Sequence, residues 1–195
     1  LALSLLLRPD FEAEHAPMLT LVMGMAACMA IEKITGLIAE IKWPNDVVIN
    51  KKKTTGILTE MGMSEGKISY VVVGIGINLN MESFPEELAY KATSLKIECG
   101  HEINRDEIAA ALLFYFEQYY EKFEQTHNLG FLIEEYNNHL VNRGKEVLIK
   151  EKDGEYTGIS RGINDKGELL VEKKDGNCVE IFSGEVSVRG LYGYV

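Results

Sequence analysis

The stretch that most constrains this chain is Lys42-Trp43-Pro44-Asn45-Asp46. Its proline cannot donate a hydrogen bond to a sheet and holds the preceding residue extended, so the chain is expected to turn just before a strand. Two β-rich runs, residues 47–50 and 57–61, then flank a lysine-rich connection and predict a β-hairpin. Asn45 and Asp46 lie at the start of its first strand, where short polar side chains bond nearby backbone or a ligand.

Asp46 and Lys53 are predicted to face each other across this hairpin. A lysine ammonium is a mobile point charge that can follow oxyanions, so the pair suits a phosphate-bearing substrate. Gly56 lacks a Cβ and would let a ligand approach the backbone closely. A solvated lysine-rich turn preceded by an Asx-turn explains the same residues, and spacing alone does not decide between the two interpretations.

A second motif, Gly74-Ile75-Gly76-Ile77-Asn78, follows residues 68–73, whose β-branched side chains predict a central strand. The motif lacks a third glycine and a following helix, so a dinucleotide-binding fold is a poor match. Glycines at the end of a buried strand would let a planar ligand lie against the backbone. Asn78 offers a donor and an acceptor to an adenine edge, and an asparagine that only holds a turn is the alternative.

The other segments before residue 143 are expected to form further strands and helices. Residues 1–9 predict a buried strand, and Pro17 fits the first turn of an apolar helix that ends at Gly36. An amphipathic helix is expected from Asn104 to about residue 124, with its aromatic side chains in the core. A shorter helix is expected at about residues 131–141.

From Lys145 the pattern changes to short strands with regular turn signals. Five strands in about fifty residues predict a small closed or nearly closed barrel. They are expected at residues 146–150, 156–163, 168–173, 179–182 and 186–189. The barrel carries two arginines of interest, Arg161 and Arg189, and a surface salt bridge is the preferred interpretation for Arg161.

Charge and cysteine content narrow the class of protein. The chain has 30 acidic and 20 basic residues and a net charge of -10, which argues against nonspecific binding of nucleic acid. Its three cysteines are scattered without metal-ligand spacing and are expected to be reduced and buried. The most apolar run, residues 18–31, is shorter than the roughly 20 residues of a membrane span, and no signal peptide is recognisable. We therefore expect a cytoplasmic protein without a membrane segment.

Three ordered strings, Lys42 to Asp46, Lys53 to Glu60 and Gly74 to Asn78, resemble the core of the biotin–protein ligase family, and the resemblance runs from Leu3 to the C-terminus. It implies an α+β fold, with a catalytic domain over residues 1–143 that has a mixed sheet and helices and is similar to class II aminoacyl-tRNA synthetases. It further implies a small SH3-like β-barrel over residues 144–195. By the same resemblance, part of the catalytic domain is expected before residue 1, namely the family's glycine- and arginine-rich loop and its Ser/Thr-Thr-Asn segment.

The activity that the resemblance implies is ATP-dependent biotin–protein ligation. The carboxylate of biotin attacks the α-phosphate of ATP, which yields biotinyl-5′-adenylate and pyrophosphate. A lysine of a biotin carboxyl carrier protein then attacks the adenylate and releases AMP. Biotin and ATP are thus the expected substrates, with Mg²⁺ accompanying ATP. Both steps need stabilised oxyanions and strict positioning, and neither needs an enzyme nucleophile.

The resemblance also implies roles for single residues. Lys53 is expected to hold the biotin carboxylate and the α-phosphate, while Asp46 orients or deprotonates the incoming lysine or assists magnesium. The biotin pocket is expected to be lined by Lys53 and by the backbone of Gly56, Ile57 and Leu58. Binding of ATP and the adenylate is expected from Asn45, Asp46, Lys53, Gly74, Gly76, Asn78 and Arg189.

Two other functions stay open at this point. One is a ligase that also acts as a biotin-responsive transcriptional repressor, which would bind DNA only through a winged helix upstream. The other is a lipoate–protein ligase of the same superfamily, which the Trp-Pro-Asn-Asp string and the C-terminal barrel argue against. A homodimer formed through sheet edges is compatible with the sequence, although no specific signal points to it.

Overall fold

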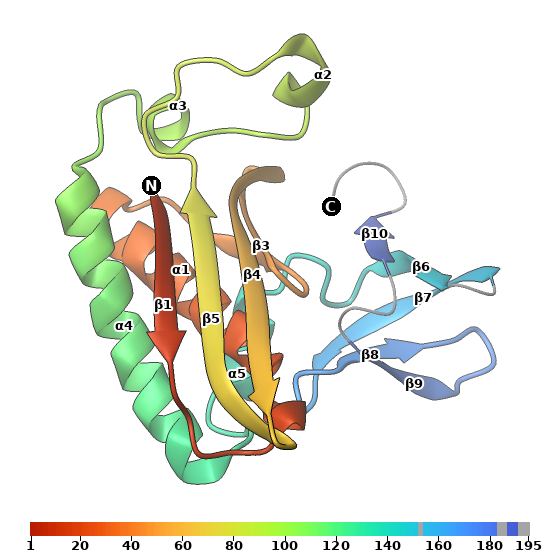
Figure 1. Cartoon of the computed structure of the whole chain (residues 1–195). Coiled ribbons are helices and arrows are strands. Elements are labelled where there is room, and N and C mark those ends of the chain that lie inside the picture. The colour runs from red at the N-terminus through yellow and green to blue at the C-terminus, as the bar shows by residue number, and fades with distance from the viewer. Residues whose placement is uncertain (152–153, 183–186, 191–195) are drawn as a thin grey trace.

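The computed structural model describes the backbone of residues 1–151, 154–182 and 187–190 and the side chains of residues 1–150 and 154–182. Two five-stranded sheets organise this part of the chain, as Figure 1 shows. The first sheet has the strand order β1-β5-β4-β3-β2 and the second has the order β10-β6-β7-β8-β9. Helices combined with these sheets confirm the predicted α+β class.

All paired strands of the first sheet run antiparallel. Its strands are β1 (Ala2–Leu7), β2 (Glu40–Lys42), β3 (Asp46–Ile49), β4 (Lys52–Ser64) and β5 (Lys67–Ile77). Two isolated bridges outside the named strands are parallel, Ile41 with Leu140 and Lys53 with Ala92. The prediction of a buried first strand was wrong, because β1 lies at the edge of the sheet and its residues alternate between exposed and half-buried.

Helix α1 (Met18–Thr35) covers one face of this sheet, and α4 (Arg105–Thr126) packs against α1 (Figure 1). Because α1 is enclosed from both sides, 12 of its 18 residues are buried. It begins after Pro17 and ends at Gly36, whose φ of 70° allows the left-handed cap that was predicted. Within the described residues, one helical stretch, Ala13–Thr35, is long and apolar enough to cross a membrane, but 67% of its apolar window is buried inside the structure.

Helix α4 starts as predicted, with the Asn104 side chain accepting a hydrogen bond from the Asp106 amide at 2.9 Å. Its buried face recurs at helical spacing and includes Phe116, Tyr119 and Phe123, which confirms that these three aromatic side chains belong to the core. The prediction was wrong for Phe114, which lies on the opposite side of the helix and is 54% exposed. The shorter helical segments are η1 (Ala13–His15), α2 (Glu86–Ala89), α3 (Leu95–Cys99) and α5 (Ile133–His139).

The second sheet contains the five predicted strands. They are β6 (Glu146–Glu151), β7 (Gly154–Ile163), β8 (Leu169–Glu172), β9 (Cys178–Ile181) and β10 (Ser187–Gly190). Hydrogen bonds attach this sheet to the segment after α4, among them one from the Leu129 amide to the Asp165 carbonyl at 2.7 Å and one from the Ile163 amide to the Asn137 side chain at 2.8 Å. The domain boundary at residue 143 stays a prediction.

The three cysteines differ in burial, which corrects the expectation that all are buried. Cys28 is buried, Cys99 is half-buried and Cys178 is exposed on the outer strand β9. Burial raises the pKa of the Cys28 thiol well above its usual value. Only Cys28 therefore belongs to the hydrophobic core in the sense that the sequence predicted.

Candidate functional site

The predicted hairpin is formed by β3 and β4, but its turn is tighter than expected. Asn50 and Lys51 have φ values of 49° and 65°, as the two central residues of a type I′ turn do. Lys52 and Lys53 consequently lie within β4 and not in the connection. The sequence prediction placed all the lysines in the loop because a run of charged residues resembles a turn more than a strand.

A bulge places Lys53 on the same face of the sheet as Asp46. Asp46 pairs with Gly56 while Val48 pairs with Lys53, so β4 uses one residue more than β3 over this interval. Because side chains alternate along a strand, Lys53 and Gly56 would otherwise point to opposite faces. The extra residue brings the Lys53 ammonium into an ion pair with the Asp46 carboxylate. The predicted convergence of these two side chains is therefore confirmed.

Asp46 lies between two lysines. Asp46 is 6% exposed, and the Lys42 ammonium lies 4.0 Å from Oδ2, the carboxylate oxygen that does not face Lys53. A buried carboxylate is costly unless nearby positive charge compensates it. Two ammonium groups around one carboxylate leave this site positively charged, as an anionic ligand requires. Lys42 was not predicted as a site residue, although its spacing of four residues from Asp46 across a proline turn could have indicated it.

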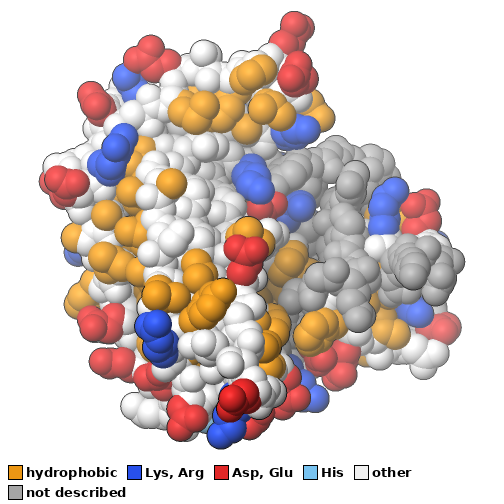
Figure 2. Space-filling model, viewed as in Figure 1, with side chains coloured by type: hydrophobic (Ala, Val, Ile, Leu, Met, Phe, Trp, Pro, Cys, Tyr) orange, Lys and Arg blue, Asp and Glu red, His pale blue; other side chains and the backbone are white. Residues whose placement is uncertain are grey.

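A row without bulky side chains runs beside this charged group. Ala2, Gly76, Gly56 and Asp46 lie next to one another across β1, β5, β4 and β3. A Cβ on Gly76 would meet no described atom within 4 Å, whereas one on Gly56 would lie 3.2 Å from the Lys53 ammonium. Figure 2 shows the resulting bare area over the middle of the sheet. Gly74 and Gly76 lie at the end of β5, as predicted, and the strand continues to Ile77.

A cavity of about 720 Å³ lies on one side of Lys53. Its floor comes from β3, β4 and β5, and its opposite wall from the loop of residues 83–92 that carries α2. Lys42, Lys53 and Lys91 line it, and Asp46 is the one acidic residue among the described residues that do so. The sequence analysis missed this loop because its segment reads as irregular. Its signal was a group of apolar side chains in a polar stretch, Phe84, Leu88 and Tyr90.

A second cavity of about 540 Å³ lies on the other side of Lys53, over β1, β4 and β5. The exposed Leu58 side chain and the backbone at Gly74 line it, and Lys53, Gly56 and Gly76 border both cavities. Lys53 thus stands between a smaller cavity beside Leu58 and a larger one that Lys42 and Lys91 also line. This arrangement can hold an extended ligand whose middle is anionic.

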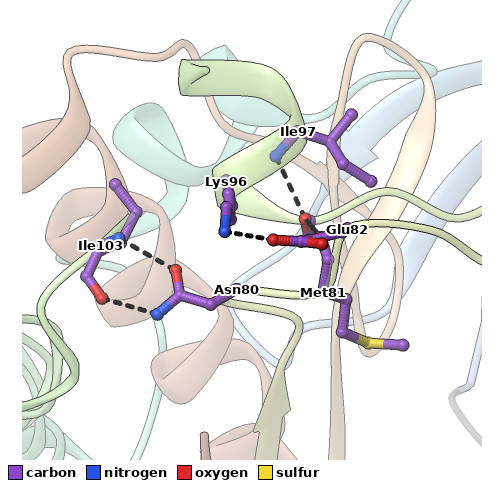
Figure 3. Close-up of polar contacts among 7 residues, drawn as sticks. Asn80, Met81, Glu82, Lys96, Ile97 and Ile103 are labelled. Carbon is purple, nitrogen blue, oxygen red and sulfur yellow. Dashed lines mark hydrogen bonds and ion pairs between the residues drawn. The ribbon is translucent and has the colours of Figure 1, made fainter. Parts of the chain in front are cut away.

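The loop of residues 83–92 is attached to the body of the protein by polar contacts around α3 (Figure 3). Asn80 accepts a hydrogen bond from the Ile103 amide and donates one to the Ile103 carbonyl, both at 2.9 Å. The Ser94 hydroxyl donates to the Met81 carbonyl at 2.5 Å. The Lys96 ammonium lies 2.6 Å from the Glu82 carboxylate at the surface. The hydrogen bonds of Asn80 and Ser94 hold the entry to the loop in one place, whereas the exposed Lys96–Glu82 ion pair contributes little.

The two asparagines predicted to bind the adenylate lie on different sides of Lys53. Asn78 lines the larger cavity and donates from its side chain to the Thr93 carbonyl at 3.1 Å. Asn45 lines the smaller cavity and donates to the Ile57 carbonyl at 3.1 Å. Each side chain therefore bonds to the backbone and also borders a cavity. The contacts of these asparagines with a ligand stay predictions.

The predictions for the two arginines of the second sheet have different outcomes. Arg161 donates from Nε to the Glu172 carboxylate at 2.7 Å, and both side chains are largely exposed, which confirms the surface salt bridge. The backbone of Arg189 pairs with Leu148 in β6, and its side chain lies outside the described residues. Its expected contact with the nucleotide stays a prediction.

The described residues contain no group of three or more histidine, cysteine, aspartate or glutamate side chains that could hold a metal ion. Asp46 alone offers a carboxylate at the larger cavity. Mg²⁺ in proteins is often held by one or two carboxylates, phosphate oxygens of the substrate and water. The residues present fit a magnesium ion that arrives with a nucleotide, with Asp46 as its one carboxylate ligand, and do not fit a resident metal centre.

Two protein families match this chain. Residues 1–78 match the biotin/lipoate A/B protein ligase family, and residues 144–189 match the biotin protein ligase C-terminal domain. The bifunctional ligase/repressor BirA of Bacillus subtilis is 37% identical over 188 residues, which are 95% of this chain and 57% of that protein. This chain therefore spans little more than half the length of that relative.

A better length match comes from other relatives. A biotin–[acetyl-CoA-carboxylase] ligase of Paracoccus denitrificans is 30% identical over 190 residues, covering 93% of this chain and 79% of that protein. The structure of the biotin protein ligase of Aquifex aeolicus in complex with biotin and ATP superposes with a TM-score of 0.84 at 32% identity, covering 97% of this chain and 78% of that one. The similarity to these relatives, in fold and in sequence, thus extends over both sheets.

Proposed function

The chain belongs to the biotin protein ligase family, and we propose that it serves the ATP-dependent ligation of biotin to protein. In this proposal, biotin and ATP react to form biotinyl-5′-adenylate, and the biotinyl group passes to a lysine of a biotin carboxyl carrier protein. Relatives named for this activity and a solved relative with biotin and ATP bound support the assignment.

One observation carries the proposal. Lys53 lies between the two cavities, above glycines that leave the backbone of β4 and β5 uncovered. Biotinyl-adenylate has the matching form, with a bicycle that joins a urea to a thioether ring at one end, an adenosine at the other and an anionic phosphate between them. We place the biotin in the smaller cavity beside Leu58 and the nucleotide in the larger one below the loop of residues 83–92.

In the first step, the biotin carboxylate and the α-phosphate of ATP are both anions that must approach each other. The Lys53 ammonium contacts both and offsets their repulsion, and it follows the negative charge that grows on the phosphate oxygens. Lys42 adds positive charge at 4.0 Å from Asp46, on the side of the larger cavity. When bound, Mg²⁺ would neutralise phosphate charge, with Asp46 as a ligand.

In the second step, a carrier lysine attacks the carbonyl carbon of the adenylate, the bond from that carbon to the phosphate oxygen breaks, and AMP leaves. The amine loses a proton in this step. Asp46 is the one carboxylate among the described residues of the larger cavity and is therefore our candidate to orient or deprotonate the amine. Its ion pair with Lys53 keeps it at the reacting bond.

Several finer features stay predictions. They are localisation in the cytoplasm, a homodimer through sheet edges, and the acetyl-CoA carboxylase carrier as the protein substrate. The repressor function named for the Bacillus subtilis relative is a second candidate function. Binding of the full-length protein to operator DNA in the presence of biotin and ATP, but not in their absence, would support it.

A transfer assay tests the proposed function. The full-length protein is incubated with ATP, Mg²⁺ and a biotin carboxyl carrier domain, with either biotin or lipoate, and the carrier mass is measured. We expect the mass to rise by one biotinyl group with biotin and not with lipoate. A carrier whose target lysine is replaced by arginine is the control and should stay unmodified. Modification by lipoate alone would instead assign the chain to lipoate transfer.

A further inference from the structure

We propose that Glu98, which lines neither cavity, is a positioning residue that holds the backbone of Lys53 through the end of the nucleotide-facing loop. This inference rests on the proposed function and goes beyond it, because it names a residue of α3 outside the motifs that identify the family. The contacts around Lys53 lead to it.

The backbone of Lys53 lies past the end of the β4–β5 pairing. That pairing begins at Thr55 with Ile77, so the edge of β4 at Lys53 has no β5 residue beside it. The end of the loop takes this place. The Lys53 amide donates to the Lys91 carbonyl at 2.8 Å, and the Lys53 carbonyl accepts from the Thr93 amide at 2.9 Å. Residues 91–93 therefore hold both backbone polar groups of Lys53.

Glu98 holds this end of the loop. One oxygen of its carboxylate accepts a hydrogen bond from the Thr93 hydroxyl at 2.5 Å, and the other accepts one from the Asn50 side chain at 2.6 Å. Thr93 is buried, whereas Asn50 lies in the turn between β3 and β4. The single carboxylate thus links the loop end to the hairpin that carries Lys53.

These bonds make the position of Lys53 depend on α3. Hydrogen bonds to an ionised acceptor are shorter and stronger than neutral ones, so the Glu98 carboxylate is a firm attachment for Thr93. Asn78, in the wall of the larger cavity, donates to the carbonyl of the same Thr93. Loss of the Glu98 carboxylate should therefore loosen Lys53 and the wall of the larger cavity, and should weaken nucleotide binding more than biotin binding, because the rest of the smaller cavity does not contact this end of the loop.

The test compares Glu98→Ala with the wild-type full-length protein in two measurements. The first is amide hydrogen exchange, where we expect the Lys53 and Thr93 amides to exchange roughly tenfold faster while the Val47 amide is unchanged. The second is biotinyl-adenylate formation. Its KM for ATP should rise by roughly tenfold, the scale of a lost hydrogen bond to a charged acceptor, and the Kd for biotin alone should rise less, by about threefold or below, because biotin also contacts residues that Glu98 does not hold.

Two further variants separate positioning from general loosening of α3. Glu82→Gln removes the exposed ion pair with Lys96 on the same helix and should leave the KM for ATP and both exchange rates unchanged. Thr93→Val removes the hydroxyl that donates a hydrogen bond to Glu98. The KM for ATP of the double variant with Glu98→Ala should therefore be no higher than that of Glu98→Ala alone.

The outcomes are distinguishable from failure of the proposed function. Unchanged exchange at Lys53 and Thr93 in Glu98→Ala overturns the positioning role, and so does an equal loss of ATP and biotin binding. If the wild-type protein forms no biotinyl-adenylate, the proposed function fails, and the exchange rates still decide whether Glu98 holds Lys53.

Discussion

The two faces of the first sheet are built from the same strands and have opposite chemistry. On β5, Val73 and Ile75 are nearly fully buried under α1. Gly74 and Gly76, the residues that follow each of them, leave the other face of the strand bare. Strand periodicity alone separates the two sets, because successive residues point to opposite sides. The comparison teaches that one face carries the fold and the other the binding site, within single strands.

This separation should be visible in mutants. Substitutions on the buried face are expected to change the free energy of unfolding, whereas those on the open face are expected to change ligand binding and catalysis.

Replacement of the central cation should have the largest effect. Lys53→Ala is expected to lower the rate of biotinyl-adenylate formation by roughly 100- to 1,000-fold, as loss of a charge-stabilising group at a reacting oxyanion does. Single-turnover formation of labelled adenylate measures it. Lys51→Gly is the matched control, since Lys51 lies in the exposed turn of the same hairpin with positive φ, and its rate should match wild type. A wild-type rate in Lys53→Ala would remove Lys53 from the site.

On the buried face, Val73→Ala should destabilise the fold. Val73 is fully buried, so deleting two methyl groups is expected to lower the free energy of unfolding by about 2 kcal/mol. Urea denaturation measures this loss, and the KM values for biotin and ATP at 20 °C are expected to stay unchanged. A changed KM at unchanged stability would show that the two faces are not separable.

On the open face, Gly76→Ala should have the opposite profile. Its Cβ meets no described atom within 4 Å, so the free energy of unfolding should not fall. The methyl group would stand where the ligand lies against the backbone, and we expect the KM for biotin or ATP to rise roughly tenfold, equivalent to about 1.4 kcal/mol. Steady-state adenylate formation measures it, and unchanged KM values would place the ligand elsewhere.

Far from both faces, Arg161→Gln should have the smallest effect. The exposed ion pair of Arg161 with Glu172 is screened by solvent, so the thermal midpoint and the rate of biotin transfer should both equal wild type. Calorimetry and the carrier assay check this. A clear loss of transfer would give the second sheet a direct part in the site through this arginine.

Much of the fold was predictable from local signals. Pro17 and Gly36 bracket α1 as expected, and Asn104 caps α4, because caps and helix ends depend on neighbouring residues. The five strands of the second sheet followed from evenly spaced turn signals. The edge position of β1 was missed, because the residues that cover or expose a strand belong to other parts of the chain.

The site was predictable in its composition and less so in its geometry. Lys53 and Asp46 were identified, but the bulge that puts them on one face depends on strand register, which no local pattern reveals. Lys42 and the loop around Tyr90 were missed because their part in the cavity arises from long-range packing. Glu98 carries no motif, so only its contacts reveal it.

A crystal structure with a non-hydrolysable biotinyl-adenylate analogue tests the central claim most directly. We expect the ligand to lie across Gly56 and Gly76, with its phosphate group in contact with the Lys53 ammonium, biotin beside Leu58 and adenosine beside the loop of residues 83–92. A ligand bound with its phosphate group away from Lys53, or in a cavity that does not include these glycines, would contradict the account.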